Sequence, residues 1–203
     1  MLAIYKKELR SYFTSMIGYV FIAFFLVIIG IYFMIYNLMF GLANFEYCLS
    51  TVTFIFVLLV PLLTMRLMSE EKKQKTDQLL LTSPLSARSI ILGKFFAVFT
   101  IFAIVMAIIC MYPLIMSLYG SIPYASAYGS ILGFTLLGGA YLAMGLFISS
   151  LTESQMVAAV ISFAVFLFTA LMEGFANIFP TDNKTAYMVF SVIVLLICLL
   201  LYH

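Results

Sequence analysis

The sequence predicts an all-α membrane protein with six transmembrane helices in a single transmembrane domain, residues 1–203. The chain is 66% hydrophobic and 9% charged, with a mean hydropathy of +1.21. A soluble domain carries about 25% charged residues, so this composition requires the bilayer as solvent. Six apolar stretches have roughly the length of a spanning helix, which is about 20 residues. They are residues 17–40, 48–66, 90–118, 127–150, 156–176 and 186–203.

Residues 1–16, before the first span, are expected to form a short elbow helix on the inner membrane surface. At helical spacing one face is partly apolar and the other is basic, which suits a helix lying on an anionic leaflet. The alternative is a solvated basic anchor that only sets the topology. The apolar face comprises Ile4, Leu9, Tyr12 and Phe13, and the basic face comprises Lys6, Lys7 and Arg10.

Lysine and arginine gather in two of the segments outside the spans. Nine of the ten lie in the N-terminal segment or between the second and third spans, helix ends included. Because basic loops stay on the cytoplasmic side, both termini are expected inside, in a multi-pass protein of the cell membrane. The predicted outer loops hold one cation, Lys184. The other nine are Lys6, Lys7, Arg10, Arg66, Lys72, Lys73, Lys75, Arg88 and Lys94.

Residues 67–89, between the second and third spans, are expected to form a cytoplasmic helix followed by a sharp break. Ser69 can cap the helix, with two acidic residues in its first turn. Pro84 disfavours helical geometry in the preceding residue and ends the helix after the leucines 79–81. Exposed leucines on a charged segment indicate contact with a partner or with lipid. The alternative is a solvated loop whose leucines only begin the return into the bilayer.

Three features are expected within the later spans. Lys94 lies about two turns into the helix of the third span and can extend its ammonium group back to the interface. Pro113 is expected to kink or end the same span near the outer side. Small residues in the fourth span allow close helix approach, in the pairs Gly129-x-x-x-Gly133, Gly139-x-x-x-Ala143 and Gly145-x-x-x-Ser149.

Several kinds of chemistry lack the residues that would carry them. The sequence has no G-x-x-x-x-G-K-[ST] motif, so no P-loop for ATP is expected. No ionisable side chain lies mid-span, where ion-coupled transporters usually place them. The three cysteines are isolated and the one histidine is His203, which argues against a metal site. We therefore expect no enzyme activity, cofactor or metal in this chain.

A family resemblance lies in the segment MRLMSEEKKQKTDQLLLTSPLSARSIILGKFFA. It is similar to the second inner segment of ABC type-2 permeases, most of all in the bacterial group that includes the gliding-motility and copper-processing permeases. The opening IYKKELRSYFTSMIGYVF and residues 149–163, SSLTESQMVAAVISF, also resemble the family, so the resemblance covers most of residues 3–165. The shared elements of the first segment are Arg66, Glu70, Glu71, Thr76, the leucines 79–81, Pro84 and Leu92-Gly93-Lys94.

The resemblance implies a six-span half-transporter that pairs with a second permease subunit, identical or different. Each half would engage a separate cytoplasmic ABC ATPase that binds ATP and Mg; no nucleic acid is implied. The helix after the second span would be the coupling helix that docks on the ATPase. The turn after the fourth span would be a second inner contact, and the elbow helix would flank the same surface. The residues so implied are Glu70, Glu71, Lys72, Lys73, Thr76, Asp77, Leu79 and Leu80 in the coupling helix, Glu153 and Gln155 in the second contact, and Lys6, Lys7 and Arg10 in the elbow helix.

The sequence departs from this family in two places. Gln74 and Lys75 precede Thr76, where many members have a glycine. Only residues 174–185 separate the fifth and sixth spans, where members usually have a longer outer segment. The first departure concerns the local turn, and the second implies a reduced outer gate or a sixth span that is partly this outer segment.

These observations predict the permease subunit of an ATP-driven transporter, by resemblance an exporter. ATP binding would close the partner ATPases, and the coupling helix would move with them and rearrange spans one, two and five. One alternative is a secondary transporter or channel that works alone and gives flux without ATP. The other is a structural subunit that anchors partners in the membrane and gives no flux. The sequence does not identify the substrate.

Overall fold

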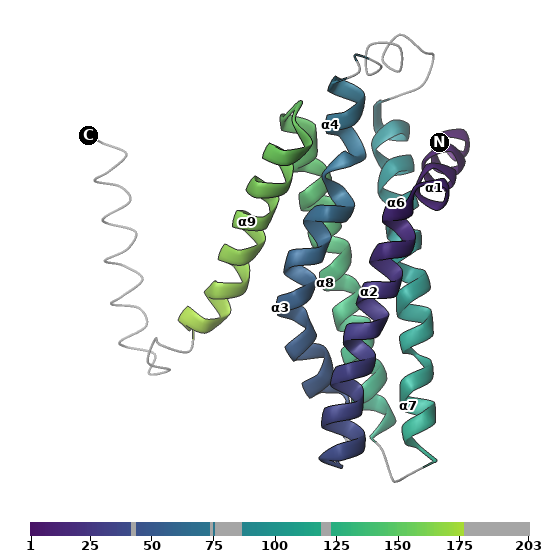
Figure 1. The fold of residues 1–203 in the computed structure, drawn as a ribbon, viewed down its shortest axis with the longest axis vertical. Helices are drawn as coiled ribbons and strands as arrows, with labels where there is room; N and C mark the ends of the chain where they lie inside the picture. Colours follow the sequence, from purple (N-terminus) through teal and green to yellow (C-terminus); the bar gives the residue numbers. More distant parts are fainter. Residues whose placement is uncertain (42–43, 74, 76–86, 119–122, 177–203) are drawn as a thin grey trace, which may run out of the picture. The chain divides into compact units, whose positions relative to one another are not determined.

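The computed structural model describes residues 1–41, 44–73, 75, 87–118 and 123–176, and every regular element in these ranges is helical (Figure 1). The chain divides into two compact units, Met1–Phe166 and Leu167–His203, and the packing described below is that of the first. The predicted sixth span, residues 186–203, lies outside the described residues.

The described helices account for five candidate spans. Each is long and apolar enough to cross a bilayer, so the prediction of an all-helical protein with several spans is confirmed for the first five. The spans are Met16–Met39, Glu46–Lys73, Arg88–Met116, Tyr124–Leu151 and Gln155–Met172. The helices are α1 (Leu2–Thr14), α2 (Met16–Phe33) with the π-helical turn η1 (Met34–Met39), α3 (Glu46–Thr64), α4 (Arg66–Lys73), α6 (Ala87–Ile109), α7 (Met111–Met116), α8 (Tyr124–Leu151) and α9 (Gln155–Ala176).

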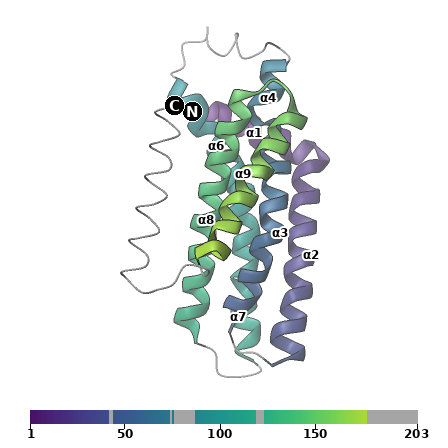
Figure 2. The same cartoon turned by 90° about the vertical axis from the view of Figure 1, so that its left-hand side faces the viewer.

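Four of the spans pack in a closed ring in the order α2, α3, α8, α6 (Figures 1 and 2). Aromatic rings fill the space between them, because large side chains bury much apolar area and attract one another at their edges. Phe56 of α3 lies at the centre of this cluster, with its ring centroid 5.5 Å from that of Phe25, 5.2 Å from Phe102 and 5.1 Å from Phe134. Phe25, Phe56 and Phe102 are completely buried.

Large apolar side chains also point away from this bundle. Val20 and Val27 of α2 are 60% and 58% exposed, and Leu132 and Leu136 of α8 are 63% and 67% exposed. A soluble protein rarely exposes such continuous apolar surface. The chain is therefore a multi-pass membrane protein whose outward faces need lipid or another helix to cover them.

Glycines set how closely α8 approaches its neighbours. A Cβ atom added to Gly138 would lie 2.4 Å from the Phe102 ring, and one added to Gly145 would lie 2.4 Å from the Thr64 hydroxyl oxygen. Gly129 and Gly133 have nothing within 4 Å of that position. Of the predicted small-residue pairs, the one that begins at Gly145 therefore lies at the closest helix approach.

Two predicted breaks can be compared with the structure. The third span is interrupted at Cys110, between α6 and α7. This is expected from Pro113, which has no backbone N–H to donate to the carbonyl oxygen four residues earlier. The predicted cap at Ser69 is wrong. Helix α4 begins at Arg66, and the Ser69 side chain lies inside it, where its hydroxyl donates to the Met65 carbonyl oxygen of the preceding turn.

The predicted helix through residues 70–81 is also interrupted. Helix α4 ends at Lys73, and Lys75 has a φ of 55°, in the left-handed region that commonly ends a helix. The Lys75 N–H donates to the Lys72 carbonyl oxygen at 3.0 Å, which closes a tight turn. The predicted contact residues Thr76, Asp77, Leu79 and Leu80 lie outside the described residues.

Candidate functional site

The described part of the predicted inner surface gathers at one end of the bundle. Figures 1 and 2 place α1, α4, the start of α6 and the end of α8 together there, and α1 packs on α6 while α4 packs on α8. The described residues of the predicted site are Lys6, Lys7 and Arg10 on α1, Glu70, Glu71, Lys72 and Lys73 on α4, and Glu153 and Gln155 at the α8–α9 turn.

Lys94 of α6 is buried at this end, with 1% of its surface exposed. Its ammonium lies 3.0 Å from a Glu8 carboxylate oxygen and 2.8 Å from one of Glu71. It also donates to the Leu67 carbonyl oxygen at 2.6 Å. The prediction that Lys94 extends to the interface is therefore wrong, because a buried ammonium with three acceptors no longer needs water. We call Lys94, Glu8, Glu71 and the Leu67 carbonyl the Lys94 node.

The node forms because α1 lies directly against α6. Gly93 allows this approach, since a Cβ atom there would lie 3.2 Å from Ile4 Cβ and from the Met1 carbonyl oxygen. About two turns further along α6, the Tyr5 hydroxyl lies 3.1 Å from the Thr100 hydroxyl. The apolar face predicted for this helix is thus partly covered by protein, with Ile4 6% exposed.

Tyr12 fixes the far end of α1 to the second span. Its hydroxyl donates to the Leu63 carbonyl oxygen at 2.9 Å. Burial, followed by the negative charge of Glu8, raises the pKa of the Tyr12 hydroxyl far above its usual range, so it stays a neutral donor. Gly18 allows the sharp turn from α1 into α2, because a Cβ atom there would lie 2.8 Å from the Tyr12 carbonyl oxygen.

The two neighbouring acids of α4 have different surroundings. The Glu71 side chain is 16% exposed and lies between Lys94 and Lys7, whose ammonium is 3.4 Å away. The Glu70 side chain is 32% exposed and pairs with Arg66 one turn earlier, at 2.8 Å. Glu71 therefore faces into the molecule and joins α4 to α1 and α6, whereas Glu70 remains closer to the surface.

Ser149, near the end of α8, holds the beginning of α4. Its hydroxyl oxygen accepts the Met68 N–H at 3.1 Å and the Ser69 N–H at 3.2 Å, and the hydroxyl donates to the Met65 carbonyl oxygen at 3.1 Å. A side chain inserted into the backbone hydrogen-bond ladder in this way interrupts a helix. It also satisfies N–H groups of the first turn, as a capping residue does. This role was not predicted; the one indication of it in the sequence is the small-residue pair Gly145-x-x-x-Ser149.

Replacing Ser149 with alanine is expected to destabilise the bundle by about 1 kcal/mol, the usual effect of losing a helix cap. The amides of Met68 and Ser69 should exchange hydrogen faster, because their acceptor is gone. The matched control is Ser150→Ala, since the Ser150 hydroxyl donates to the Phe147 carbonyl oxygen of its own helix. Equal exchange at Met68 and Ser69 in the two variants would contradict the capping role. Hydrogen exchange with thermal unfolding in detergent measures both effects.

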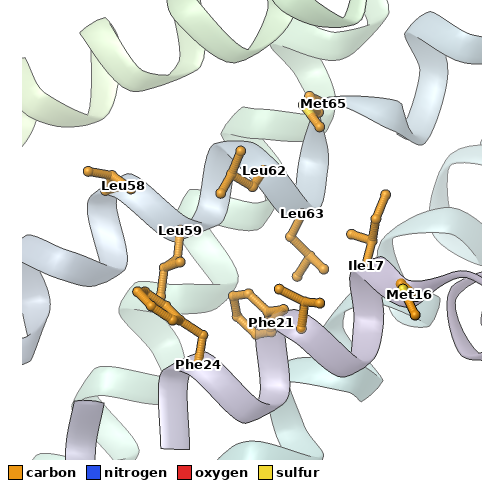
Figure 3. A pocket seen from close by; sticks show the side chains of 10 residues that line it. Met16, Ile17, Phe21, Phe24, Leu58, Leu59, Leu62, Leu63 and Met65 are labelled. Carbon is orange, nitrogen blue, oxygen red and sulfur yellow. The ribbon is translucent and has the colours of Figure 1, made fainter. Parts of the chain in front are cut away.

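A separate feature is an apolar groove of about 420 Å³ between α2 and α3 (Figure 3). All of its lining side chains are apolar, so it has no polar group that could orient a polar ligand. Such a groove suits a lipid chain or the side chains of another helix. The lining residues are Met16, Ile17, Val20, Phe21, Phe24, Leu58, Leu59, Leu62, Leu63 and Met65.

Comparison with known proteins gives one match. A family model described as "ABC-2 family transporter protein" matches residues 42–202, most of the chain. The matched range contains α4, Lys94 and Ser149 and begins after α1. No curated protein and no solved structure matches the chain.

Proposed function

Because the chain belongs to the ABC-2 family of transporter proteins and is thus the permease subunit of an ABC transporter, we propose that it works as an exporter driven by a separate cytoplasmic ATPase. That partner would bind and hydrolyse ATP with Mg, and a second permease subunit would complete the transporter. The similarity of residues 66–94 supports a place near the gliding-motility and copper-processing permeases.

The anchoring of α4 supports this proposal most directly. This short charged helix continues the second span and is joined by polar contacts to α1, α6 and α8. Such links would pass a displacement of α4 to the neighbouring helices, because separating buried polar partners is costly. Closure of the ATPases would displace α4, and the displacement would rearrange the spans to alternate access.

The geometry divides the predicted contact residues into two groups. Glu71 lies in the Lys94 node, so its proposed role is to hold α4 in place rather than to touch the ATPase. The other predicted residues remain the proposed docking surface. These are Glu70, Lys72, Lys73, Thr76, Asp77, Leu79 and Leu80 after the second span, Glu153 and Gln155 in the second contact, and Lys6, Lys7 and Arg10 beside them.

The orientation in the membrane is part of the proposal. Docking on a cytoplasmic ATPase requires α4 and the α8–α9 turn to face the cytoplasm, with the N-terminus on the same side. The cations of α1 and α4 support this, since basic segments stay inside. The proposed location is the cell membrane.

The docking role is tested by replacing Leu79 and Leu80 with aspartate in the chain produced with the ATPase encoded beside it. The wild-type chain should co-purify with this ATPase and transport only with ATP. The double variant should lose the complex, because two carboxylates cannot enter an apolar contact without a large desolvation cost. Leu118→Asp, at the other end of the bundle on an 82% exposed leucine, is the control and should keep the complex.

Two results would contradict this function. ATP-independent flux through the purified chain in liposomes would favour a transporter or channel that works alone. Retention of the complex by the Leu79→Asp, Leu80→Asp variant would show that the ATPase docks elsewhere. The measurements are affinity co-purification with the ATPase and ATP-driven uptake of candidate substrates into inverted vesicles.

A further inference from the structure

The Lys94 ammonium is saturated by partners from two other helices. It carries three N–H donors, and three acceptors surround it: Glu8 of α1, Glu71 of α4 and the backbone carbonyl of Leu67 at the start of α4. Two of the three contacts therefore hold α4, one through a side chain and one through the backbone. Since Lys94 itself belongs to α6, a single buried group joins three elements.

The charges around this group balance. Glu71 also pairs with Lys7 of α1 at 3.4 Å, so two cations face two carboxylates. The four groups differ in exposure, from 65% for the Lys7 side chain to 1% for Lys94, with Glu8 at 12% and Glu71 at 16%. Pulling α4 away from α6 would separate buried charges, which costs far more than separating the same charges in water.

We propose that Lys94 is a positioning residue that fastens α4 and α1 to α6, so that a displacement of α4 is passed to the third span as well as to the second. This inference rests on the proposed function, because it names the contact through which a movement of α4 imposed by the ATPase reaches the third span. The second span follows α4 through the chain itself. The third span follows α4 in the chain only after residues 74–86, and within the described residues the node is a direct polar link between the two helices.

The test must separate transmission from simple stability. The variant combines Glu8→Gln, Glu71→Gln and Lys94→Met, which removes the three charges and keeps similar side-chain volumes. Exchanging a buried ion network for neutral groups of similar size is often tolerated, so this chain should fold. With the ATPase, the variant should still form the complex and hydrolyse ATP. The ATP-dependent change in the distance between spin labels on α6 and α8 should be lost, while the change between labels on α3 and α8 remains.

Two matched controls accompany this variant. Glu46→Gln removes a carboxylate at the start of α3, and Arg88→Met removes an exposed cation six residues before Lys94 on α6. Both should keep the wild-type displacement of the third span. Where the triple variant does not fold, Glu71→Gln alone serves, since it weakens the link to α4 while Lys94 keeps Glu8 and the Leu67 carbonyl.

The outcomes separate this inference from the proposed function. An unchanged displacement of the third span in the triple variant would overturn the inference, and so would loss of ATPase binding, which would make the node part of the docking surface. Absence of a complex with the wild-type chain would instead overturn the proposed function and the transmission with it. Hydrogen exchange on the chain alone then decides whether the node fastens the helices: amides of α1 and α4 should exchange faster together in the triple variant and not in the controls.

Discussion

Replacing Gly145 with valine is expected to lower the free energy of unfolding of the bundle by about 2–4 kcal/mol. Even a single Cβ atom at this position would lie 2.4 Å from the Thr64 hydroxyl oxygen and 2.8 Å from Thr64 Cβ. Thr64 is completely buried and its hydroxyl is bound to the Val60 carbonyl oxygen at 3.1 Å, so it has little room to move. Overpacking of this kind costs about 1–3 kcal/mol. The cap that Ser149 provides one turn further along would be pulled away as well, for about 1 kcal/mol more.

Gly133→Val is the matched control for this prediction. It makes the same change in the same helix, and nothing lies within 4 Å of a Cβ atom added there. The helix propensities of the two variants change equally, so the difference between them isolates the clash. Loss of helical circular dichroism on heating in detergent measures it. If both variants unfolded at the same temperature, the close approach of α8 to α3 would not be a constraint on the fold.

The spans could be predicted from sequence because their cause is local. An apolar run of the right length forms a helix in a bilayer wherever it stands in the chain, since every backbone group must be paired internally. Pro113 interrupts the third span for an equally local reason, its missing N–H. The family could also be recognised from local motifs, and the family model matches residues 42–202.

The polar contacts that join α1, α4, α6 and α8 could not be predicted in this way. The Lys94–Glu8 pair joins residues 86 positions apart, and the Ser149 cap joins residues 80 positions apart. Taken alone, Lys94 is a lysine near a membrane surface, and such a lysine ordinarily extends its ammonium group into water. Taken alone, Ser69 before two acids is a good capping candidate. Tertiary packing overrides both local preferences, because α1 covers Lys94 and Ser149 already occupies the start of α4.

The distinction between Glu70 and Glu71 has the same origin. Their positions in the sequence are equivalent for docking, and only the rotation of α4 about its axis decides which one faces α6. That rotation is set by two buried residues on different sides of the helix. Leu67 lies one turn before Glu71 and its carbonyl oxygen accepts from Lys94 of α6, whereas the Ser69 N–H donates to Ser149 of α8. The proposed docking role of Thr76, Asp77, Leu79 and Leu80 and the predicted sixth span rest on the sequence alone.

Replacing Lys94 with methionine, without any other change, is expected to lower the free energy of unfolding by about 3–5 kcal/mol. We expect no larger loss from any other single substitution at the end of the bundle that holds α1 and α4. The side chain keeps its apolar stem, so packing against α1 is largely preserved. What is lost is the cation between two carboxylates whose side chains are 12% and 16% exposed. Glu8 and Glu71 would then repel each other with less compensation, because the Lys7 side chain that still pairs with Glu71 is 65% exposed, and the Leu67 carbonyl oxygen would lose this donor. The measurement is thermal unfolding of the purified chain in detergent.

Two causes of this loss of stability can be distinguished, namely the uncompensated carboxylates and the lost packing. If uncompensated carboxylates are its cause, adding Glu8→Gln and Glu71→Gln to Lys94→Met should recover most of the stability, although more contacts have been changed. If lost packing is the cause, the triple variant should be no more stable than the single one. Arg88→Met, which removes an exposed cation from the same helix, should change stability by no more than about 0.5 kcal/mol.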